Sequence, residues 1–370
     1  MDFHLSEDLQ EVEALAAEIL GDLAAVDRVR EVETTESRVD ERLWGELAKA
    51  GLLGIALPEE YDGAGLGLAG LCVVLEQQGR TVAPAPLWSA GVAGLVLASY
   101  GSEEQRALLT GCADGSVRIT LALEEFAPAV PAEPATTARA DGDGWVLTGT
   151  KAVVPSATGA THVLVSAQTP DGPGLFLLET GAAGLAWETA ETTSRDHAAH
   201  LELTDARAAA VGEPGGPVLA TTLRWSAVAL AAVQLGVAEG ALKHAASYLS
   251  GREQFGRPLA TFQAVQHQLA DCFIDIDAMR VTLWQAVTLE EDGEPVAATR
   301  ATLVAKWWCD QAGLDVVHRV QHVHGGIGVD VDYPVHRYFL WGKQISSTLG
   351  GAVQALEDLG AGLSSLEIAS

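Results

Sequence analysis

Residues 252–258 and 262–271 read REQFGRP and FQAVQHQLAD, and residues 324–337 read HGGIGVDVDYPVHR. These three stretches lie among long segments with helical apolar spacing, each long enough for a bundle helix. The predicted helices are Leu219–Tyr248, Phe262–Leu289, Ala297–Val320 and Tyr338–Gly362. We therefore expect a C-terminal bundle of four helices, with the quoted stretches at its turns and helix starts.

Upstream of this bundle the character of the sequence changes twice. Residues 1–115 carry apolar positions at helical spacing, and Ser6 precedes the first helix as an expected N-cap. Residues 116–216 alternate apolar and polar side chains between Asp-Gly and Pro-Gly turns, which predicts β-hairpins. Helical patterning returns in residues 217–370. The sequence therefore predicts an α+β chain with an N-terminal helical domain, a middle β domain and a C-terminal helical bundle.

The composition excludes several classes of function. The chain has 22 basic and 50 acidic residues and a net charge of −28, which disfavours nucleic acid and anionic membranes as partners. An anionic cofactor would need local Arg, Lys or helix N-termini. The four cysteines, Cys72, Cys112, Cys272 and Cys309, lack metal or disulfide spacing, which predicts free thiols. The polar, acidic N-terminus and the lack of an uninterrupted apolar run predict a cytoplasmic protein without a signal peptide or membrane span.

A third, weaker stretch runs from Leu43-Trp44 to Leu57-Pro58-Glu-Glu-Tyr61. At these separations the combined stretches resemble the acyl-CoA dehydrogenase family, and the likeness extends over essentially the whole chain. The resemblance implies an N-terminal helical domain, a middle β-barrel-like domain and a C-terminal four-helix bundle. It also implies FAD-dependent α,β-dehydrogenation of an acyl-CoA thioester, in which a carboxylate removes the α proton while hydride leaves the β carbon for the flavin.

In this family each FAD lies between two subunits, so a chain offers groups to its partner's cofactor. By resemblance, Arg252 reaches the pyrophosphate, whose oxygens suit a planar guanidinium, and Phe255 is the aromatic beside it. Gly325 and Gly326 would let the backbone approach the cofactor, because neither has a Cβ. His322 stands where the family usually has Gln, which alters the contact but keeps a hydrogen-bond donor.

Both positions at which the family places its catalytic carboxylate lack one here. Counting from the Tyr-Pro-Val segment, the first falls on Leu349, in a region with no acidic residue between Asp332 and Glu357. Counting back from Phe255, the second falls on Ser226. Neither leucine nor serine supplies the carboxylate that must accept the α proton. We therefore assign no catalytic residue to this chain.

The middle region departs from the family as well. Residues 123–130 lack the Gly-Ser-Asp that usually ends a flavin-binding loop. Val153 and Pro155 replace the Trp and Thr of the strand that usually holds the flavin ring, and proline also lacks an N–H. The groups for binding a flavin in cis are thus degraded, whereas those offered in trans are kept.

This asymmetry predicts the non-catalytic subunit of a heteromeric acyl-CoA dehydrogenase, similar to actinobacterial pairs linked to steroid side-chain breakdown. The resemblance then implies an α2β2 heterotetramer with a homologous subunit that carries the catalytic Glu, together with an acyl-CoA substrate and a flavoprotein electron acceptor. Two alternatives stay open: a self-sufficient homotetramer with an unrecognised base, and a non-catalytic acyl-CoA-binding scaffold.

Two other features have simpler interpretations. His318 and His322 share a helix face near His324, but no acidic or Cys third ligand is positioned nearby, so we expect no metal site. Glu124 and Glu125 form the only acidic pair in the degraded loop. We interpret this pair as a solvated strand end rather than as an unusual base.

Overall fold

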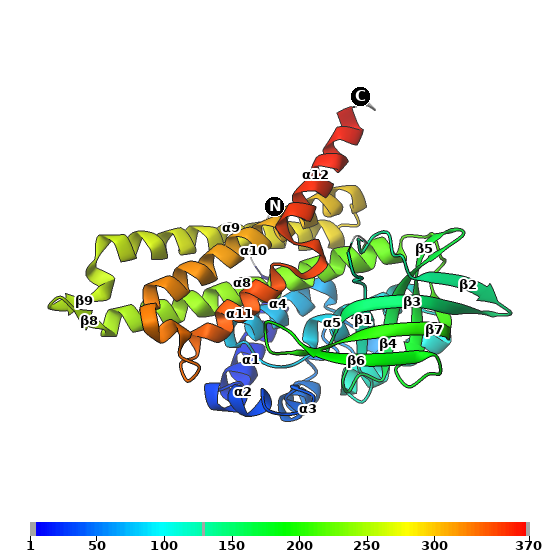
Figure 1. The fold of residues 1–370 in the computed structure, drawn as a ribbon, viewed down its shortest axis with the longest axis horizontal. Coiled ribbons are helices and arrows are strands. Elements are labelled where there is room, and N and C mark those ends of the chain that lie inside the picture. Colours follow the sequence, from blue (N-terminus) through cyan, green and yellow to red (C-terminus); the bar gives the residue numbers. More distant parts are fainter. Residues whose placement is uncertain (1–4, 128–129, 368–370) are drawn as a thin grey trace. The chain divides into compact units, whose positions relative to one another are not determined.

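The computed structural model describes residues 5–127 and 130–367 (Figure 1). Their contacts divide the chain into two compact units. The first, here called the bundle unit, comprises Met1–Val26, Cys72–Ala83 and Ala227–Ser370. The second, here called the barrel unit, comprises Asp27–Leu71 and Pro84–Ser226. The three domain boundaries expected from the sequence stay a prediction.

The N-terminal region is helical, as its apolar spacing predicts. Its helices are α1 (Glu7–Leu23), α2 (Val26–Val32), α3 (Glu41–Lys49), α4 (Gly67–Thr81), α5 (Leu87–Tyr100), α6 (Glu103–Arg106) and α7 (Leu109–Asp114), with a 3-10 turn η1 (Glu59–Tyr61). The Ser6 hydroxyl accepts a hydrogen bond from the Leu9 amide, which confirms the predicted cap of α1. Asp40 caps α3 in the same way and also pairs with Arg28 of α2, so one carboxylate fixes both elements.

The middle region forms a seven-stranded sheet whose pairings close into a ring. Its strands are β1 (Ile119–Ala122), β2 (Thr137–Asp141), β3 (Gly144–Pro155), β4 (His162–Thr169), β5 (Gly172–Glu179), β6 (Leu185–Glu191) and β7 (His197–Val211). β4 pairs with β5, β5 with β7, β7 with β3, β3 with β2, and β2 with β4. Leu147, Phe176 and Leu201 are among the apolar side chains of its core. The barrel-like β region is thus confirmed.

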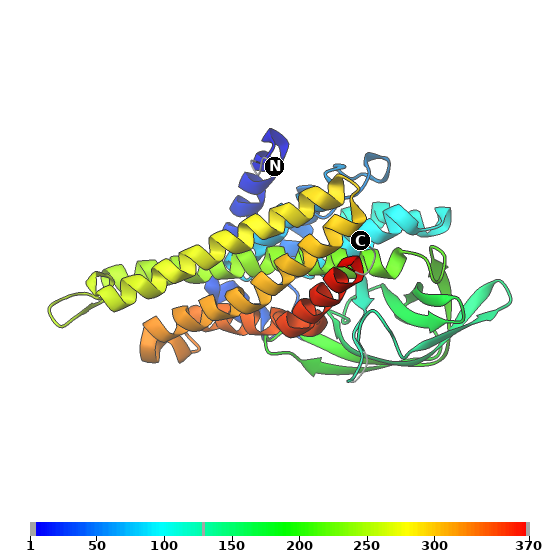
Figure 2. The same ribbon diagram turned by 90° about the horizontal axis from the view of Figure 1, so that it is seen from above.

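The C-terminal region forms the long helices of the bundle. They are α8 (Val218–Gly251), α9 (Gln263–Glu291), α10 (Pro295–His324), α11 (Val335–Ile345) and α12 (Gly351–Glu367). The connections contain the hairpin β8 (Glu253–Gln254) and β9 (Arg257–Pro258) and the 3-10 turns η2 (Leu259–Thr261), η3 (Gly325–Val329) and η4 (Thr348–Gly350). α9 and α10 pack side by side, as both views show (Figures 1 and 2). By length and composition α8 also passes as a membrane span, but 72% of its most apolar window is buried, as in a core helix.

One predicted helix is wrong as a single element. The segment Tyr338–Gly362 is divided between α11 and α12. Leu349, Gly350 and Gly351 have φ values of 57°, 95° and 71°, which a right-handed helix does not allow. Two adjacent glycines make this reversal inexpensive, and the helical apolar spacing on either side conceals it in the sequence.

Candidate functional site

The sequence-predicted cofactor contacts lie at one end of the bundle unit. Tyr248, near the end of α8, stacks on His324, the last residue of α10, with 4.8 Å between ring centroids. Tyr333 lies 5.5 Å from the His324 ring and 6.0 Å from the Tyr248 ring. This aromatic cluster joins the end of α8 to the end of α10. The β8–β9 hairpin and the η3 turn therefore lie at the same end of the helices (Figures 1 and 2).

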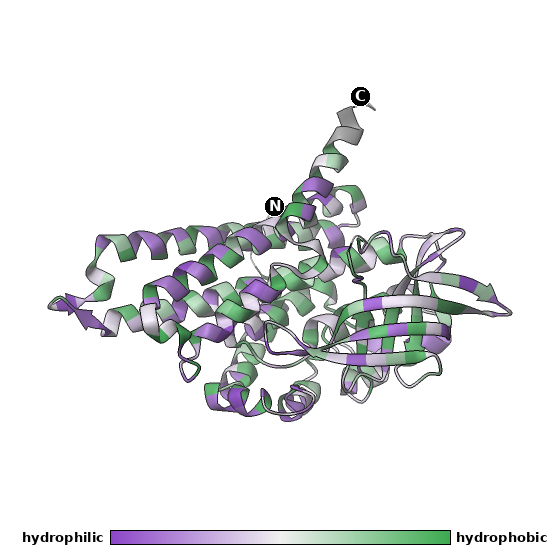
Figure 3. Cartoon of the chain, in the orientation of Figure 1, coloured by the Kyte–Doolittle hydropathy of each residue, from purple (hydrophilic) through white to green (hydrophobic). Residues whose placement is uncertain are grey.

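The hairpin presents Arg252 and Phe255 to solvent. The Arg252 side chain is exposed just beyond α8. Phe255 is 90% exposed and has a φ of 56°, a conformation that is strained for a bulky residue. The hairpin around it is mostly hydrophilic (Figure 3). A rigid aromatic ring held out in this way is suited to contact with another chain or its ligand.

The turn after α10 offers open backbone. Gly325 has a φ of 62°, which favours glycine, and its amide donates to the carbonyl of His322. No atom lies within 4 Å of a Cβ built on Gly325 or Gly326, so a ligand can approach both. The His322 side chain is exposed beside them. With the guanidinium of Arg252, these groups suit the anionic phosphates of FAD, the cofactor that the resemblance implies.

His324 is buried behind this turn. Its Nδ1 lies 2.7 Å from the carbonyl oxygen of Val320, and its Nε2 has no hydrogen-bond partner within residues 5–127 and 130–367. Burial lowers the pKa of His324. The imidazole is therefore neutral near pH 7, and its ring serves to pack the aromatic cluster.

The first empty base position lies in a left-handed turn, residues 347–351, here called the base-position turn. Leu349 is half-buried there, with a φ of 57° and a ψ of 44°. Lys306 of α10 donates from Nζ to the carbonyl of Thr348 at 2.9 Å and forms an ion pair with Asp310. Lys306 is 4% exposed and Asp310 is 2% exposed. A buried ion pair thus fixes the backbone of the turn in which a carboxylate is missing.

The sequence analysis did not identify Asp310, an acidic residue of α10 that lies near this turn through its ion pair with Lys306. Burial raises its pKa to about 7. Its Oδ1 has no hydrogen-bond partner in the described part of the chain. A Lys and an Asp four residues apart on an otherwise apolar helix face are the signal that could have revealed the pair.

The second empty base position belongs to the core. Ser226 of α8 has no exposed surface, and its Oγ finds no partner among the described residues. The position as folded here has no opening through which a side chain could meet a substrate.

The base-position turn and the turn after α10, at Gly325–Gly326, are far apart within the bundle unit. Lys306 contacts the first turn and Gly325 begins the second, 19 positions further along α10. At 1.5 Å per residue this corresponds to roughly 28 Å. A single small group cannot contact both turns at this distance. The two turns would therefore contact different parts of a long ligand, or two different ligands.

In the barrel unit, Val153 and His200 are bonded to each other where the resemblance expects a flavin ring in cis. Val153 has a φ of 51°, and its amide donates to Nδ1 of His200 at 3.2 Å. The His200 ring packs against Phe126, with 4.9 Å between centroids. Pro155 offers no N–H. The Val153 amide is therefore engaged within the chain, and neither Val153 nor Pro155 offers the flavin a free backbone donor. Residues 128–129 of the same loop lie outside the described residues.

Glu125 has a structural partner. Lys151, a fully buried residue of β3, donates to Glu125 at 2.5 Å and to the hydroxyl of Ser166 at 2.9 Å. Burial raises the pKa of Glu125, but the Lys151 ammonium and the hydrogen bond from the Thr136 amide outweigh it and hold the pKa below its usual range. Glu125 is therefore an ionised partner of Lys151 rather than a solvated strand end, and the sequence-based interpretation was wrong on that point.

The described residues contain no group of three His, Cys, Asp or Glu side chains that could hold a metal ion. The ring of His318 instead meets the ring of Phe339 edge-on, with 4.8 Å between centroids.

Family models for three acyl-CoA dehydrogenase domains match the chain in succession. The N-terminal domain model matches residues 6–116, the middle domain model residues 124–206 and the C-terminal domain model residues 213–358. The chain is 38% identical to acyl-CoA dehydrogenase FadE27 of Mycobacterium tuberculosis over 97% of this chain and 98% of that protein. It is 32% identical to FadE28 of the same species, over 86% and 91% of the two chains.

Solved structures agree with these matches. A chain from a variant of the steroid ACAD Tcur3481–Tcur3483 is 62% identical with a TM-score of 0.96, over 98% of this chain and 99% of that chain. A chain of the ChsE4–ChsE5 complex from Mycobacterium tuberculosis is 36% identical with a TM-score of 0.93, over the same shares. The predicted fold, with helical, β and helical regions in that order, is confirmed.

Proposed function

The chain belongs to the acyl-CoA dehydrogenase family, and we propose that it is the non-catalytic subunit of a heteromeric, FAD-dependent member of that family. The observation that carries this proposal is the contrast between the two halves of its site. Leu349 and Ser226 provide no base, and the Val153 amide is already bonded to His200, whereas the β8–β9 hairpin and the turn at Gly325–Gly326 are exposed. FAD would supply the hydride acceptor for α,β-desaturation of an acyl-CoA.

In this proposal the chain contributes binding and orientation rather than proton transfer. Arg252 engages the pyrophosphate of the FAD held by its partner, and Phe255 packs beside that cofactor. The backbone at Gly325 and Gly326 approaches it closely, and His322 donates a hydrogen bond. The partner subunit supplies the Glu that removes the α proton, and the two chains form an α2β2 heterotetramer.

Two similar structures support the nature of the partner and the substrate. Both are described by a pair of chain names, and one of them is described as a steroid ACAD. We propose by this likeness a related acyl-CoA dehydrogenase as the partner, a steroid-derived acyl-CoA as the substrate and a flavoprotein as the electron acceptor. The assembly would work in the cytoplasm.

The test is to purify the chain alone and together with a related acyl-CoA dehydrogenase subunit that carries the catalytic Glu. We expect the lone chain to carry little flavin and no activity, and the pair to carry FAD and to desaturate an acyl-CoA. Full flavin occupancy and turnover by the lone chain would exclude the proposal.

Arg252 and Arg257 provide a matched comparison within the hairpin. The Arg257 guanidinium lies over the ring of Phe262, 4.1 Å from its centroid, and so is engaged within the chain. We expect Arg252→Gln to weaken FAD binding in the complex by roughly 10- to 100-fold, because a charge-assisted phosphate contact is lost. Arg257→Gln should change it less than about threefold. If both substitutions weaken FAD binding equally, the cause is a changed hairpin conformation, and the proposed phosphate contact of Arg252 is excluded.

Asp310 favours one alternative, a self-sufficient enzyme with a base that the motifs do not reveal. Burial raises its pKa to about 7, within the range of a general base. Its ion pair with Lys306 and its 2% exposure argue for a structural role. Asp310→Asn separates the two: a base predicts a fall in kcat of at least about a hundredfold, whereas a structural residue predicts lower stability with nearly unchanged kcat.

A further inference from the structure

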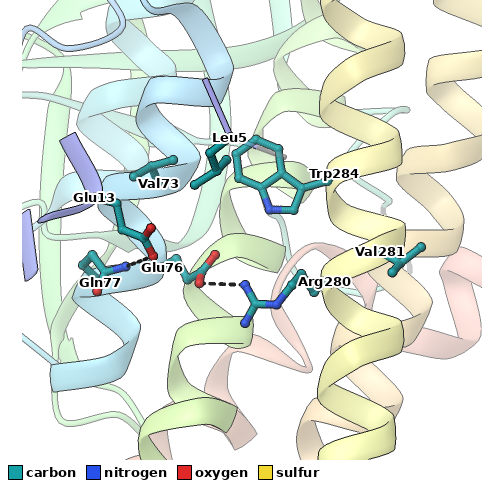
Figure 4. A pocket seen from close by; sticks show the side chains of 8 residues that line it. All are labelled: Leu5, Glu13, Val73, Glu76, Gln77, Arg280, Val281 and Trp284. Carbon is teal, nitrogen blue, oxygen red and sulfur yellow. Dashed lines mark hydrogen bonds and ion pairs between the residues drawn. The ribbon is translucent and has the colours of Figure 1, made fainter. Parts of the chain in front are cut away.

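A cavity of about 200 Å³ lies within the bundle unit (Figure 4), and no residue of the aromatic cluster lines it. α1, α4 and α9 supply its walls. Leu5, Val73 and Val281 give it an apolar side, and Glu13, Glu76 and Arg280 give it a charged side. A volume of this size equals that of about seven water molecules at ~30 Å³ each. It suits an organic molecule of about eight heavy atoms.

The charged side of the cavity belongs to a network with one carboxylate in excess. Arg80 pairs with Glu76 and Glu239 at 2.5 Å each and more distantly with Glu13 at 3.4 Å. Arg280 pairs with the same Glu76, at 2.9 Å, and with Glu239. Three carboxylates thus face two guanidiniums, and both guanidiniums are engaged. Among residues 5–127 and 130–367, the network therefore lacks one positive charge.

Of the three carboxylates, Glu13 has the weakest contacts with the two guanidiniums. Its Oε1 receives long contacts from Arg80 at 3.4 Å and from Gln77 at 3.3 Å. Its Oε2 has no hydrogen bond or ion pair in the described chain, and its side chain is 36% exposed. A cation that enters the cavity would meet a carboxylate oxygen that is free to bind it.

Trp284 provides a second, independent unsatisfied group. The residue is 9% exposed, and its indole N–H makes no hydrogen bond to any described residue. Figure 4 shows the indole nitrogen turned toward the space above the Glu76–Arg280 pair. The indole nitrogen is not among the buried polar atoms that lack a partner, so it is accessible from the cavity that Trp284 lines. An acceptor bound in the cavity could therefore take this hydrogen bond.

We propose that this cavity binds a small organic cation that also carries a hydroxyl group, an amino alcohol. Its ammonium group binds Glu13 and completes the charge of the network, and its hydroxyl oxygen accepts the hydrogen bond of Trp284. Its hydrocarbon part packs against Leu5, Val73 and Val281. The chain's net charge of −28 further enriches cations near its surface. This site is independent of the proposed cofactor contacts.

The test is to titrate the purified complex, or the chain alone, with trans-4-aminocyclohexanol and to follow binding by ligand-observed NMR. We expect saturable binding to one site per chain. Cyclohexylamine, which lacks the hydroxyl, should bind roughly fivefold more weakly, and cyclohexanol, which lacks the charge, roughly tenfold more weakly. Equal binding of all three molecules, or no saturable binding, would overturn the proposal.

Two substitutions locate the site. Glu13→Gln removes the free carboxylate while its two long contacts contribute little to the fold, and it should weaken amino alcohol binding about tenfold. Glu18→Gln on the same helix is the control and should not change binding. Trp284→Phe should remove the advantage of the amino alcohol over cyclohexylamine. Unchanged binding in the Glu13→Gln variant would place the ligand elsewhere and refute the assignment.

Discussion

The ring of Tyr248 stacks on the ring of His324, with 4.8 Å between centroids and 19° between planes. This contact joins the ends of α8 and α10 within the bundle unit, and so places the hairpin with Arg252 and the turn with Gly325 at the same end of the helices. The proposed cofactor contacts therefore depend on a buried histidine that is not one of them.

Removing the His324 ring should loosen this end of the bundle. We expect His324→Ala to lower the free energy of unfolding by about 2 kcal/mol, because the ring of Tyr248 loses its packing partner. His324→Phe keeps a ring in place and should cost less than about 1 kcal/mol. Urea unfolding measures both. Equal losses in the two variants would show that the stack contributes little.

The same histidine should make stability depend on pH. Burial lowers the pKa of His324, so the folded protein holds the neutral form where the unfolded chain already binds a proton. Stability is then fully present above the unfolded pKa of about 6.5 and falls as pH decreases below it. We expect the stability difference between the wild type and His324→Phe to shrink or reverse between about pH 7 and pH 5. Parallel pH profiles would contradict this account.

Lys306 should hold the base-position turn. Lys306→Met removes the hydrogen bond to Thr348 and leaves the Asp310 carboxylate buried without its partner, which should cost about 3 to 5 kcal/mol. The double variant Lys306→Met/Asp310→Asn should recover part of this loss, because no buried charge then lacks a partner. Hydrogen exchange of residues 347–351 should accelerate in both variants. Unchanged exchange would show that the two glycines alone shape the turn.

Lys151 should stabilise the barrel through Glu125. Its side chain is fully buried, and Lys151→Met leaves a carboxylate inside the barrel that only backbone amides satisfy, at a cost of about 3 kcal/mol. The exposed pair of Lys49 with Glu46 is the control, since Lys49→Met should change stability by less than about 0.5 kcal/mol. Thermal unfolding compares the two. A small effect of Lys151→Met would indicate that water reaches Glu125.

The sequence predicted those elements whose periodicity reflects one-sided burial. The helices within residues 1–115 and the hairpins within residues 116–216 are of this kind. In β6 the pattern is weak, because all of its residues are at least partly exposed. The division between α11 and α12 was missed because apolar spacing continues on both sides of Leu349.

The sequence by itself determined the family, the order of helical and β regions and the absence of a carboxylate at Leu349 and Ser226. The absence of a carboxylate follows from residue identity alone, because neither leucine nor serine has a carboxyl group in any fold. Only the tertiary structure decided that Tyr248 meets His324, that Lys306 holds the base-position turn and that Val153 is bonded to His200. These contacts join residues far apart in the chain, and their geometry arises from packing rather than from local pattern.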